Sequence, residues 1–142
     1  MLTPHFDLDE FVFSSTAQRL GIDNTPPLGL IPAIAKCALG LEQVRDILGQ
    51  PIRIDSGYRC PMLNKAVGGA ANSAHMDGYA ADFTTPFGSP LEVVKALVAA
   101  NMDFDQLIQE GTWTHISFAP SLQRQVLTAH FTAGGTVYTE GV

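Results

Sequence analysis

Apolar residues between positions 30 and 48 recur at steps of three and four, up to a glycine at position 49. This spacing gathers apolar side chains on one face of a helix and is typical of a helix packed against a core. A glycine at position 40 weakens the pattern without breaking it. We therefore predict a main core helix whose buried face comprises Leu30, Ile34, Cys37, Leu41, Val44 and Leu48.

Three shorter helices are predicted from capping signals. Asp7 with Glu10 can satisfy free backbone N–H groups at a helix start, and a first helix is expected to run from there to about residue 19. Pro61 opens a short helix that ends at a pair of glycines. Ser89 is followed by proline and, three positions on, by Glu92, which predicts a helix start and a helix to about residue 101.

Alternating apolar and polar residues predict the strands. Residues 51–55 alternate as in a half-buried strand. Three β-rich runs, 104–110, 113–119 and 125–131, are separated by turn-like breaks and suggest an antiparallel meander. The order of helices and strands predicts an α+β fold, with a small antiparallel sheet flanked by helices, in a single domain over residues 1–142.

Composition narrows the range of partners. The 142 residues, 46% of them hydrophobic, are enough for one sizeable core. A net charge of -6 offers no basic surface for nucleic acid or an anionic membrane, so neither is an expected partner, and we expect a monomer. The sequence has no long apolar run and no apolar leader at its N-terminus, so we expect a soluble protein without its own export signal.

The two cysteines, Cys37 and Cys60, are too few for a disulfide framework and lack the spacing of a zinc-binding pair. Free thiols are the simpler interpretation. A single bridge between them is left open, because the sequence does not fix the distance between their Cα atoms.

The candidate chemistry lies in the segment from Ser73 to Asp82. His75 and Asp82 stand on either side of Gly78, which permits a tight turn. His115 lies in a later β-rich run, where alternation puts it on one strand face with residues 113 and 117. Two histidines and one aspartate would form a three-ligand zinc site with the fourth position open, as in catalytic zinc sites. The spacing by itself does not show that His115 meets His75.

The string SGYRCPMLNKAVGGAANSAHMDGYAADF, with a later W-T-H, resembles the family of zinc D-Ala-D-Ala carboxypeptidases and L-alanyl-D-glutamate endopeptidases. That family includes vancomycin-resistance dipeptidases and many phage endolysins, and the hedgehog signalling domain shares its fold. The motifs S-G-Y-R, S-x-H-x-x-G-x-A-x-D and W-x-H occur in order. Residues 5–27 also look like the helical lead-in of the single-domain phage and prophage branch, so the resemblance covers nearly the whole chain.

The resemblance implies one zinc ion (Zn2+) per chain, held by His75, Asp82 and His115. It also implies that Arg59 acts in catalysis and substrate binding, since a guanidinium can offer parallel hydrogen bonds to a substrate carboxylate or polarised carbonyl. Ser73 is expected to bind the substrate near the metal, and the alternative is a serine that only forms the turn.

The general base departs from the family pattern. Many members carry a glutamate three residues before the last histidine ligand, where this chain has Thr112. Glu110 is the nearest carboxylate, and a tight turn after it could bring it over the metal, so it is the expected base. Asp105 is the competing candidate, and Asp77 is a weaker one.

The implied function is hydrolysis of peptidoglycan stem peptides by a zinc-activated water, as a D-Ala-D-Ala carboxypeptidase or an L-alanyl-D-glutamate endopeptidase. Which bond is cut is left open. The alternative is a wall-binding or phage structural module that keeps the zinc site with little or no activity, and the displaced glutamate favours it. The resemblance favours a phage or prophage lysis protein (an endolysin) that stays cytoplasmic until it is released onto the cell wall.

Overall fold

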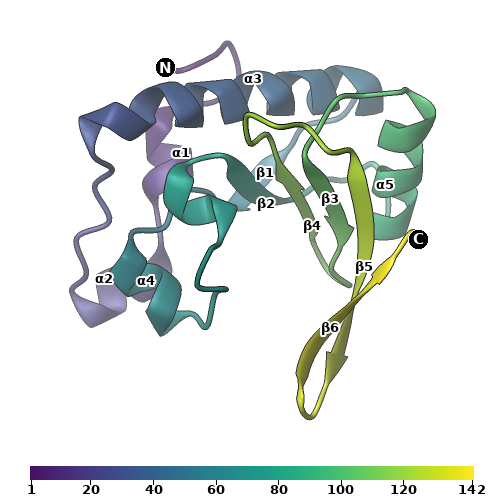
Figure 1. The fold of residues 1–142 in the computed structure, drawn as a ribbon. Coiled ribbons are helices and arrows are strands. Elements are labelled where there is room, and N and C mark those ends of the chain that lie inside the picture. The colour runs from purple at the N-terminus through teal and green to yellow at the C-terminus, as the bar shows by residue number, and fades with distance from the viewer.

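The computed structural model describes residues 1–142 as a six-stranded mixed sheet with helices (Figure 1), which confirms the α+β class. The strands are β1 (Arg53–Ser56), β2 (Ala80–Thr84), β3 (Gln106–Gln109), β4 (Thr114–Ser117), β5 (Gln125–Thr132) and β6 (Gly135–Glu140), in the order β1-β2-β4-β3-β5-β6. The helices are α1 (Leu8–Val12), α2 (Ser15–Leu20), α3 (Ile31–Leu48), α4 (Pro61–Ala66) and α5 (Pro90–Ala99), with 3-10 turns η1 (Leu28–Leu30) and η2 (Ala74–Asp77). None of these helices has the length and apolar character needed to cross a lipid bilayer.

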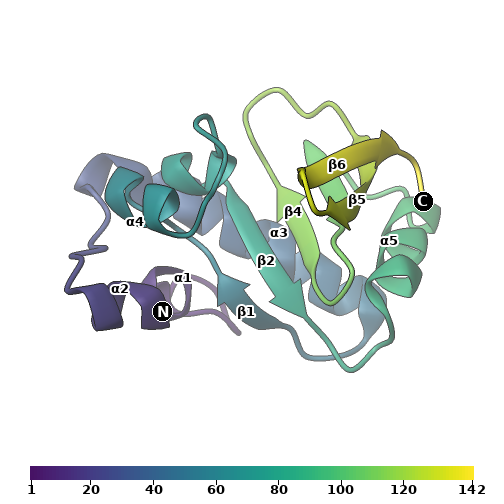
Figure 2. The same ribbon diagram turned by 90° about the horizontal axis from the view of Figure 1, so that it is seen from below.

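The predicted core helix is confirmed as α3, which packs its apolar face on the sheet. Leu41 of α3 is buried in one hydrophobic core with Phe83 of β2 and Ile116 of β4. Figure 2 looks onto the opposite face of the sheet, with α3 behind it. Because side chains alternate along a strand, Asp82 and His115, the neighbours of these core residues, point to that opposite face.

The first predicted helix is wrong in one respect, because the structure has two helices, α1 and α2, in its place. The Asp7 backbone N–H donates to the Glu10 carboxylate at 2.7 Å, as the capping pattern predicted. The chain leaves the helical conformation at Phe13, and the Ser14 hydroxyl then accepts the Ala17 N–H at 3.1 Å to start α2. A serine side chain that binds a nearby backbone N–H competes with a continuous helix at this point.

The predicted antiparallel meander is wrong at one strand pair. β3 and β4 are antiparallel, as are β5 and β6, but β5 runs parallel to β3. Since β4 already lies between β2 and β3, the chain crosses over residues 118–124 and adds β5 at the free edge of β3. There the Gln125 N–H donates to the Asp105 carbonyl at 2.9 Å, so β5 begins where β3 begins. The sheet is therefore mixed.

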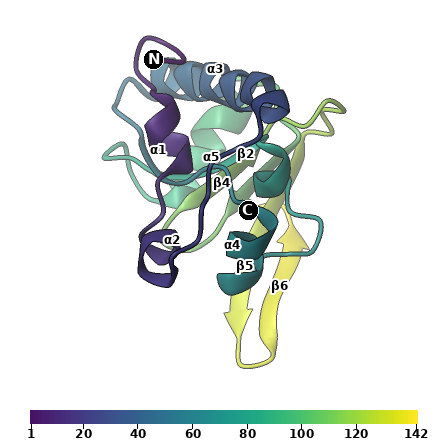
Figure 3. The same ribbon diagram turned by 90° about the vertical axis from the view of Figure 1, so that its left-hand side faces the viewer.

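Two segments project from the sheet face that α3 leaves uncovered. Figures 1 and 3 show α4 and the β5–β6 hairpin on the side of the sheet away from α3. They belong to opposite edges of the sheet, since α4 follows the edge strand β1 and the hairpin contains the other edge strand, β6. The part of the sheet between them carries Asp82 and His115.

The two cysteines are both free, so the bridge that the sequence left open is not formed. Cys37 is buried on α3, and burial raises the pKa of its thiol. The Cys60 sulfur accepts the Leu63 N–H at 3.4 Å at the start of α4. Both cysteines therefore have local structural roles.

We predict that Leu41→Ala lowers the free energy of unfolding by about 2–5 kcal/mol, because Leu41 is fully buried and its loss leaves a cavity in the core. Leu39 lies on the same helix but is 58% exposed, and Leu39→Ala is the matched control, with an expected change of about 0.5 kcal/mol or less. Urea unfolding followed by circular dichroism measures both. Equal losses in the two variants would contradict the assignment of the buried face of α3.

Candidate metal centre

His75 is held by a 3-10 turn that one serine and one glycine define. Ser73 precedes η2, and its hydroxyl accepts the His75 backbone N–H at 3.2 Å. Gly78 ends the turn with a φ of 81°, in the left-handed region that favours glycine. The turn places the His75 side chain, which is 2% exposed, just before β2.

Asp82 and His115 face each other across the β2–β4 pair, where they are direct register partners. Partner side chains lie on the same face of a sheet, with Cβ atoms about 4.5–5.5 Å apart. His115 Nδ1 lies 2.9 Å from Asp82 Oδ1, and His75 Nε2 lies 3.3 Å from the same oxygen. The structure therefore brings together all three residues that the sequence motif suggested as ligands.

The spacing of these donor atoms fits a zinc ion. One ligand atom from each of the three residues lies within 4.8 Å of the other two. Around a tetrahedral zinc ion with bonds of about 2.0–2.1 Å, two donor atoms lie about 3.3 Å apart. The distances from Asp82 Oδ1 to His75 Nε2 and to His115 Nδ1, 3.3 and 2.9 Å, are close to that value. Three protein ligands leave the fourth position open, as a catalytic zinc site requires.

A backbone carbonyl orients the His75 ring. Nδ1 lies 2.7 Å from the Gly57 carbonyl oxygen and donates to it, so Nε2 keeps its lone pair for a metal. Burial lowers the pKa of His75, which favours the neutral form that binds metal. Sequence reasoning missed Gly57, because its contribution comes from the backbone and leaves no side-chain signal.

The Asp82 carboxyl stays ionised although it lies inside the site. Burial acts to raise the pKa of this carboxyl. The interactions with His75 and His115 outweigh burial and hold the pKa well below its ordinary value. The carboxylate is thus in the form that can bind a cation.

Arg59 reaches the same site from the loop after β1. Its backbone N–H donates to the His75 carbonyl at 3.0 Å, and its guanidinium donates to the Ser73 hydroxyl at 3.4 Å. Its Nε is buried without a hydrogen-bond partner. Ser73 therefore forms the turn and also holds the arginine. Its contact with a substrate stays a prediction.

Glu110 lies directly after β3, in a tight turn that leads into β4. Its N–H donates to the Trp113 carbonyl at 3.0 Å, and Gly111 supplies a φ of 82°. Burial and the charge of Asp82 raise the pKa of Glu110, while His115 acts to lower it. Glu110 lies two residues beyond Ile108, the register partner of His115, so its side chain extends from the same face of the sheet as the ligands. A raised pKa suits a group that accepts and returns a proton near neutral pH.

The two other carboxylates considered from the sequence lie away from this arrangement. Asp105 accepts a backbone N–H from the loop before β5 at 3.3 Å. Asp105 lies three residues before Ile108, the register partner of His115. Three residues span about 10 Å along a strand. Asp77 is exposed at the end of η2. Of the three carboxylates, Glu110 lies on the sheet face that carries Asp82 and His115, and its role as the base stays a prediction.

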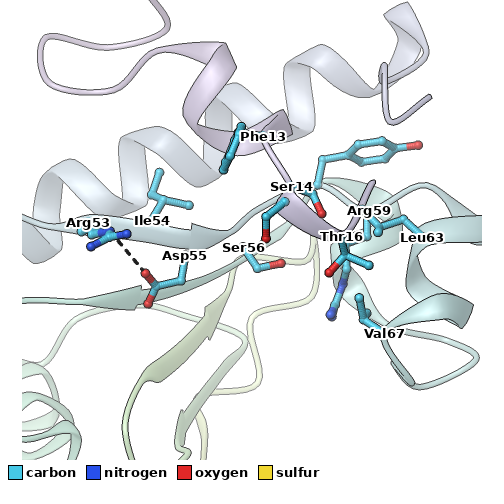
Figure 4. Close-up of a pocket in the computed structure, with 12 residues that line it drawn as sticks. Phe13, Ser14, Thr16, Arg53, Ile54, Asp55, Ser56, Arg59, Leu63 and Val67 are labelled. Atoms are coloured by element: carbon cyan, nitrogen blue, oxygen red, sulfur yellow. Dashed lines mark ion pairs between the residues drawn. The ribbon is translucent and has the colours of Figure 1, made fainter. Parts of the chain in front are cut away.

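A pocket of about 350 Å³ adjoins Arg59 beside the edge strand β1 (Figure 4). Arg53 and Asp55 also line it and form an ion pair of 3.7 Å, drawn as a dashed line in Figure 4. Ser56, another lining residue, is the register partner of Asp82. The pocket therefore runs along β1, the strand that pairs with β2, and offers space beside Arg59, although none of the three metal ligands lines it.

Two histidines and one aspartate with zinc spacing on an α+β sheet match the three-ligand pattern of catalytic zinc enzymes. Residues 4–117 match the family Peptidase M15, and because this is most of the chain, the protein belongs to that family. The matched span ends with β4, so the β5–β6 hairpin lies beyond it.

One similar protein is the zinc D-Ala-D-Ala carboxypeptidase of Streptomyces albus G. The two share 38% identity over 72 residues, which is 50% of this chain and 28% of that protein. The chain therefore spans less than a third of the length of this relative.

We predict that His75→Ala abolishes stoichiometric zinc binding, because two remaining ligands do not complete the site. The matched control is His130→Ala, since His130 is an exposed strand residue whose Nε2 contacts the Thr139 hydroxyl at 2.8 Å. Metal analysis after dialysis should find one zinc per chain in the parent protein and in the control. Parental zinc content in His75→Ala would show that this ligand set is wrong.

Proposed function

We propose that this protein hydrolyses peptide bonds in the stem peptides of peptidoglycan, with zinc held by His75, Asp82 and His115. The proposal is carried by one arrangement: three ligand atoms lie within 4.8 Å of one another, Glu110 lies two residues beyond the register partner of His115, and the Arg59 N–H binds the His75 carbonyl. The name of the similar protein, a D-Ala-D-Ala carboxypeptidase, supports the choice of substrate. Membership of Peptidase M15 supports the reaction type.

Arg59 binds and orients the substrate in this proposal. Burial lowers its pKa, while Asp82 and Glu110 act to raise it, and an arginine keeps its positive charge in such surroundings. Its donors can bind a substrate carboxylate or the carbonyl oxygen of the bond to be cut. The pocket beside it then receives the adjoining part of the peptide.

Glu110 moves the proton. Its carboxylate accepts a proton from the attacking water and returns it to the leaving amine, so the products are a carboxylate and a free amine. When bound, zinc lowers the pKa of water from about 15.7 towards about 7 and polarises the carbonyl group. The half-buried position of Glu110 keeps its proton affinity above that of an exposed glutamate.

Mass analysis of fragments released from purified peptidoglycan tests the proposal and identifies the bond. Free D-alanine indicates carboxypeptidase action, and fragments that begin with D-glutamate indicate endopeptidase action. A chelator should stop either reaction, and added zinc should restore it. If the zinc-loaded protein releases no fragment, a wall-binding module replaces the peptidase as the better interpretation.

We predict that Glu110→Gln lowers the rate of hydrolysis by about 10²- to 10⁴-fold, the usual contribution of general acid–base catalysis. Glutamine keeps the size of the side chain but does not accept a proton from water at neutral pH. Zinc content should stay parental, because Glu110 is not among the three ligands. Steady-state kinetics and metal analysis of the same preparation measure the two effects.

Asp105→Asn is the matched control, since it makes the same chemical change at the competing carboxylate. It should keep parental activity, because Asp105 serves the loop before β5. Loss of activity in Asp105→Asn with full activity in Glu110→Gln would move the base to Asp105. Full activity in both variants would refute the mechanism.

A further inference from the structure

The β5–β6 hairpin places one tyrosine on the sheet face that carries the metal ligands. Ile108 of β3 is the register partner of His115 on β4 and of Leu127 on β5. Two residues further along β5, Ala129 is the partner of Tyr138 on β6. Because register partners share a face and side chains alternate along a strand, Tyr138 and His115 point to the same side of the sheet.

Packing fixes this hairpin beside the turn that carries Glu110. The rings of Phe131 and Trp113 lie 5.9 Å apart between centroids. The hairpin also touches the turn at Gly111, where a Cβ atom would lie 3.5 Å from the Phe131 ring. A small buried cluster joins β3 to β5 on this face and consists of Ile108, Leu127 and Ala129. The position of Tyr138 relative to the turn is therefore set by side-chain contacts as well as by backbone pairing.

Tyr138 can reach a bound peptide. It is 51% exposed, so a substrate can contact it. The parallel β3–β5 register ends at Gln109 and Thr128, and one further step along it would set Glu110 opposite Ala129. Glu110 and Tyr138 are thus about two strand spacings, or about 10 Å, apart at Cα, and their side chains extend from the same face.

The hydroxyl of Tyr138 is a hydrogen-bond donor at neutral pH. Burial, together with the charges of Glu110 and Asp82, raises the pKa of this phenol, so it keeps its proton. A protonated phenol next to a peptide donates to an oxygen acceptor. A carbonyl or carboxylate oxygen is the group that such a donor would recognise.

We propose that Tyr138 is a substrate-binding residue whose hydroxyl donates a hydrogen bond to a carbonyl or carboxylate oxygen of the peptide, on the Glu110 side of the metal centre. This inference rests on the proposed peptidase function. Arg59 follows the edge strand at one side of the sheet and Tyr138 lies on the edge strand at the other, so the two donors would hold the peptide from opposite sides. Tyr138 lies outside residues 4–117, the span that matches the family.

Tyr138→Phe tests this role because it removes only the hydroxyl. The substrate is a synthetic stem peptide that contains both an L-alanyl-D-glutamate and a D-alanyl-D-alanine bond. We expect kcat/KM to fall by about 10- to 100-fold. This is the range for loss of one hydrogen bond to a charged oxygen, or to an oxygen that gains charge during the reaction. Zinc content and melting temperature should equal those of the parent protein. The Glu110→Gln variant should bind the peptide without rapid turnover. Calorimetry should therefore show weaker binding of the same peptide to the double variant with Tyr138→Phe than to Glu110→Gln alone.

Thr139→Val is the matched control, since it removes a hydroxyl from the opposite face of β6. It should leave kcat/KM within about twofold of the parent, because that face does not carry the metal ligands. Parental kinetics and peptide affinity in Tyr138→Phe would overturn the inference while leaving the peptidase function intact. Equal losses in Tyr138→Phe and Thr139→Val would also overturn it, because the hairpin and not the phenol would then matter. No hydrolysis by the parent protein would overturn both proposals.

Discussion

The antiparallel register of β2 and β4 is the constraint on which the site depends. It sets Asp82 opposite His115 on the exposed face and, one residue further along each strand, sets core residues such as Phe83 on the face covered by α3. A slip by one residue would send every side chain of the slipped strand to the other face. The energy that buries Phe83 and Ile116 therefore also holds the two ligands in place. Core packing and metal geometry are two results of one strand pairing.

The third ligand depends on backbone groups from a different part of the chain. The Gly57 carbonyl orients His75, and the Arg59 N–H binds the His75 carbonyl, so the segment after β1 grips η2 at two points. Ser73 joins the same network through its hydroxyl. A buried carboxylate such as Asp82 is costly unless it is paired. This network holds His75, the β2–β4 pairing holds His115, and both histidines pair with the Asp82 carboxylate.

Two elements bound the uncovered sheet face, and only one of them lies in the span that matches the family. On one side, α4 and the loop that carries Arg59 belong to the span shared with Peptidase M15. On the other side, the β5–β6 hairpin lies beyond that span, yet Phe131 packs on Trp113 and fixes it beside the turn of Glu110. The hairpin can therefore differ between related proteins while the strands that carry the ligands stay in place.

The sequence by itself determined the elements whose cause is local. The three- and four-residue spacing of apolar residues predicted α3, the Ser89 capping pattern predicted α5, and the motif supplied the three ligand residues. Tertiary structure decided what depends on distant segments: the parallel pairing of β3 and β5, and the meeting of His115 with Asp82. The physical reason is the distance along the chain over which each interaction acts. Helix periodicity and caps act within a few residues, whereas strand order and register are fixed only when the whole chain buries its apolar faces.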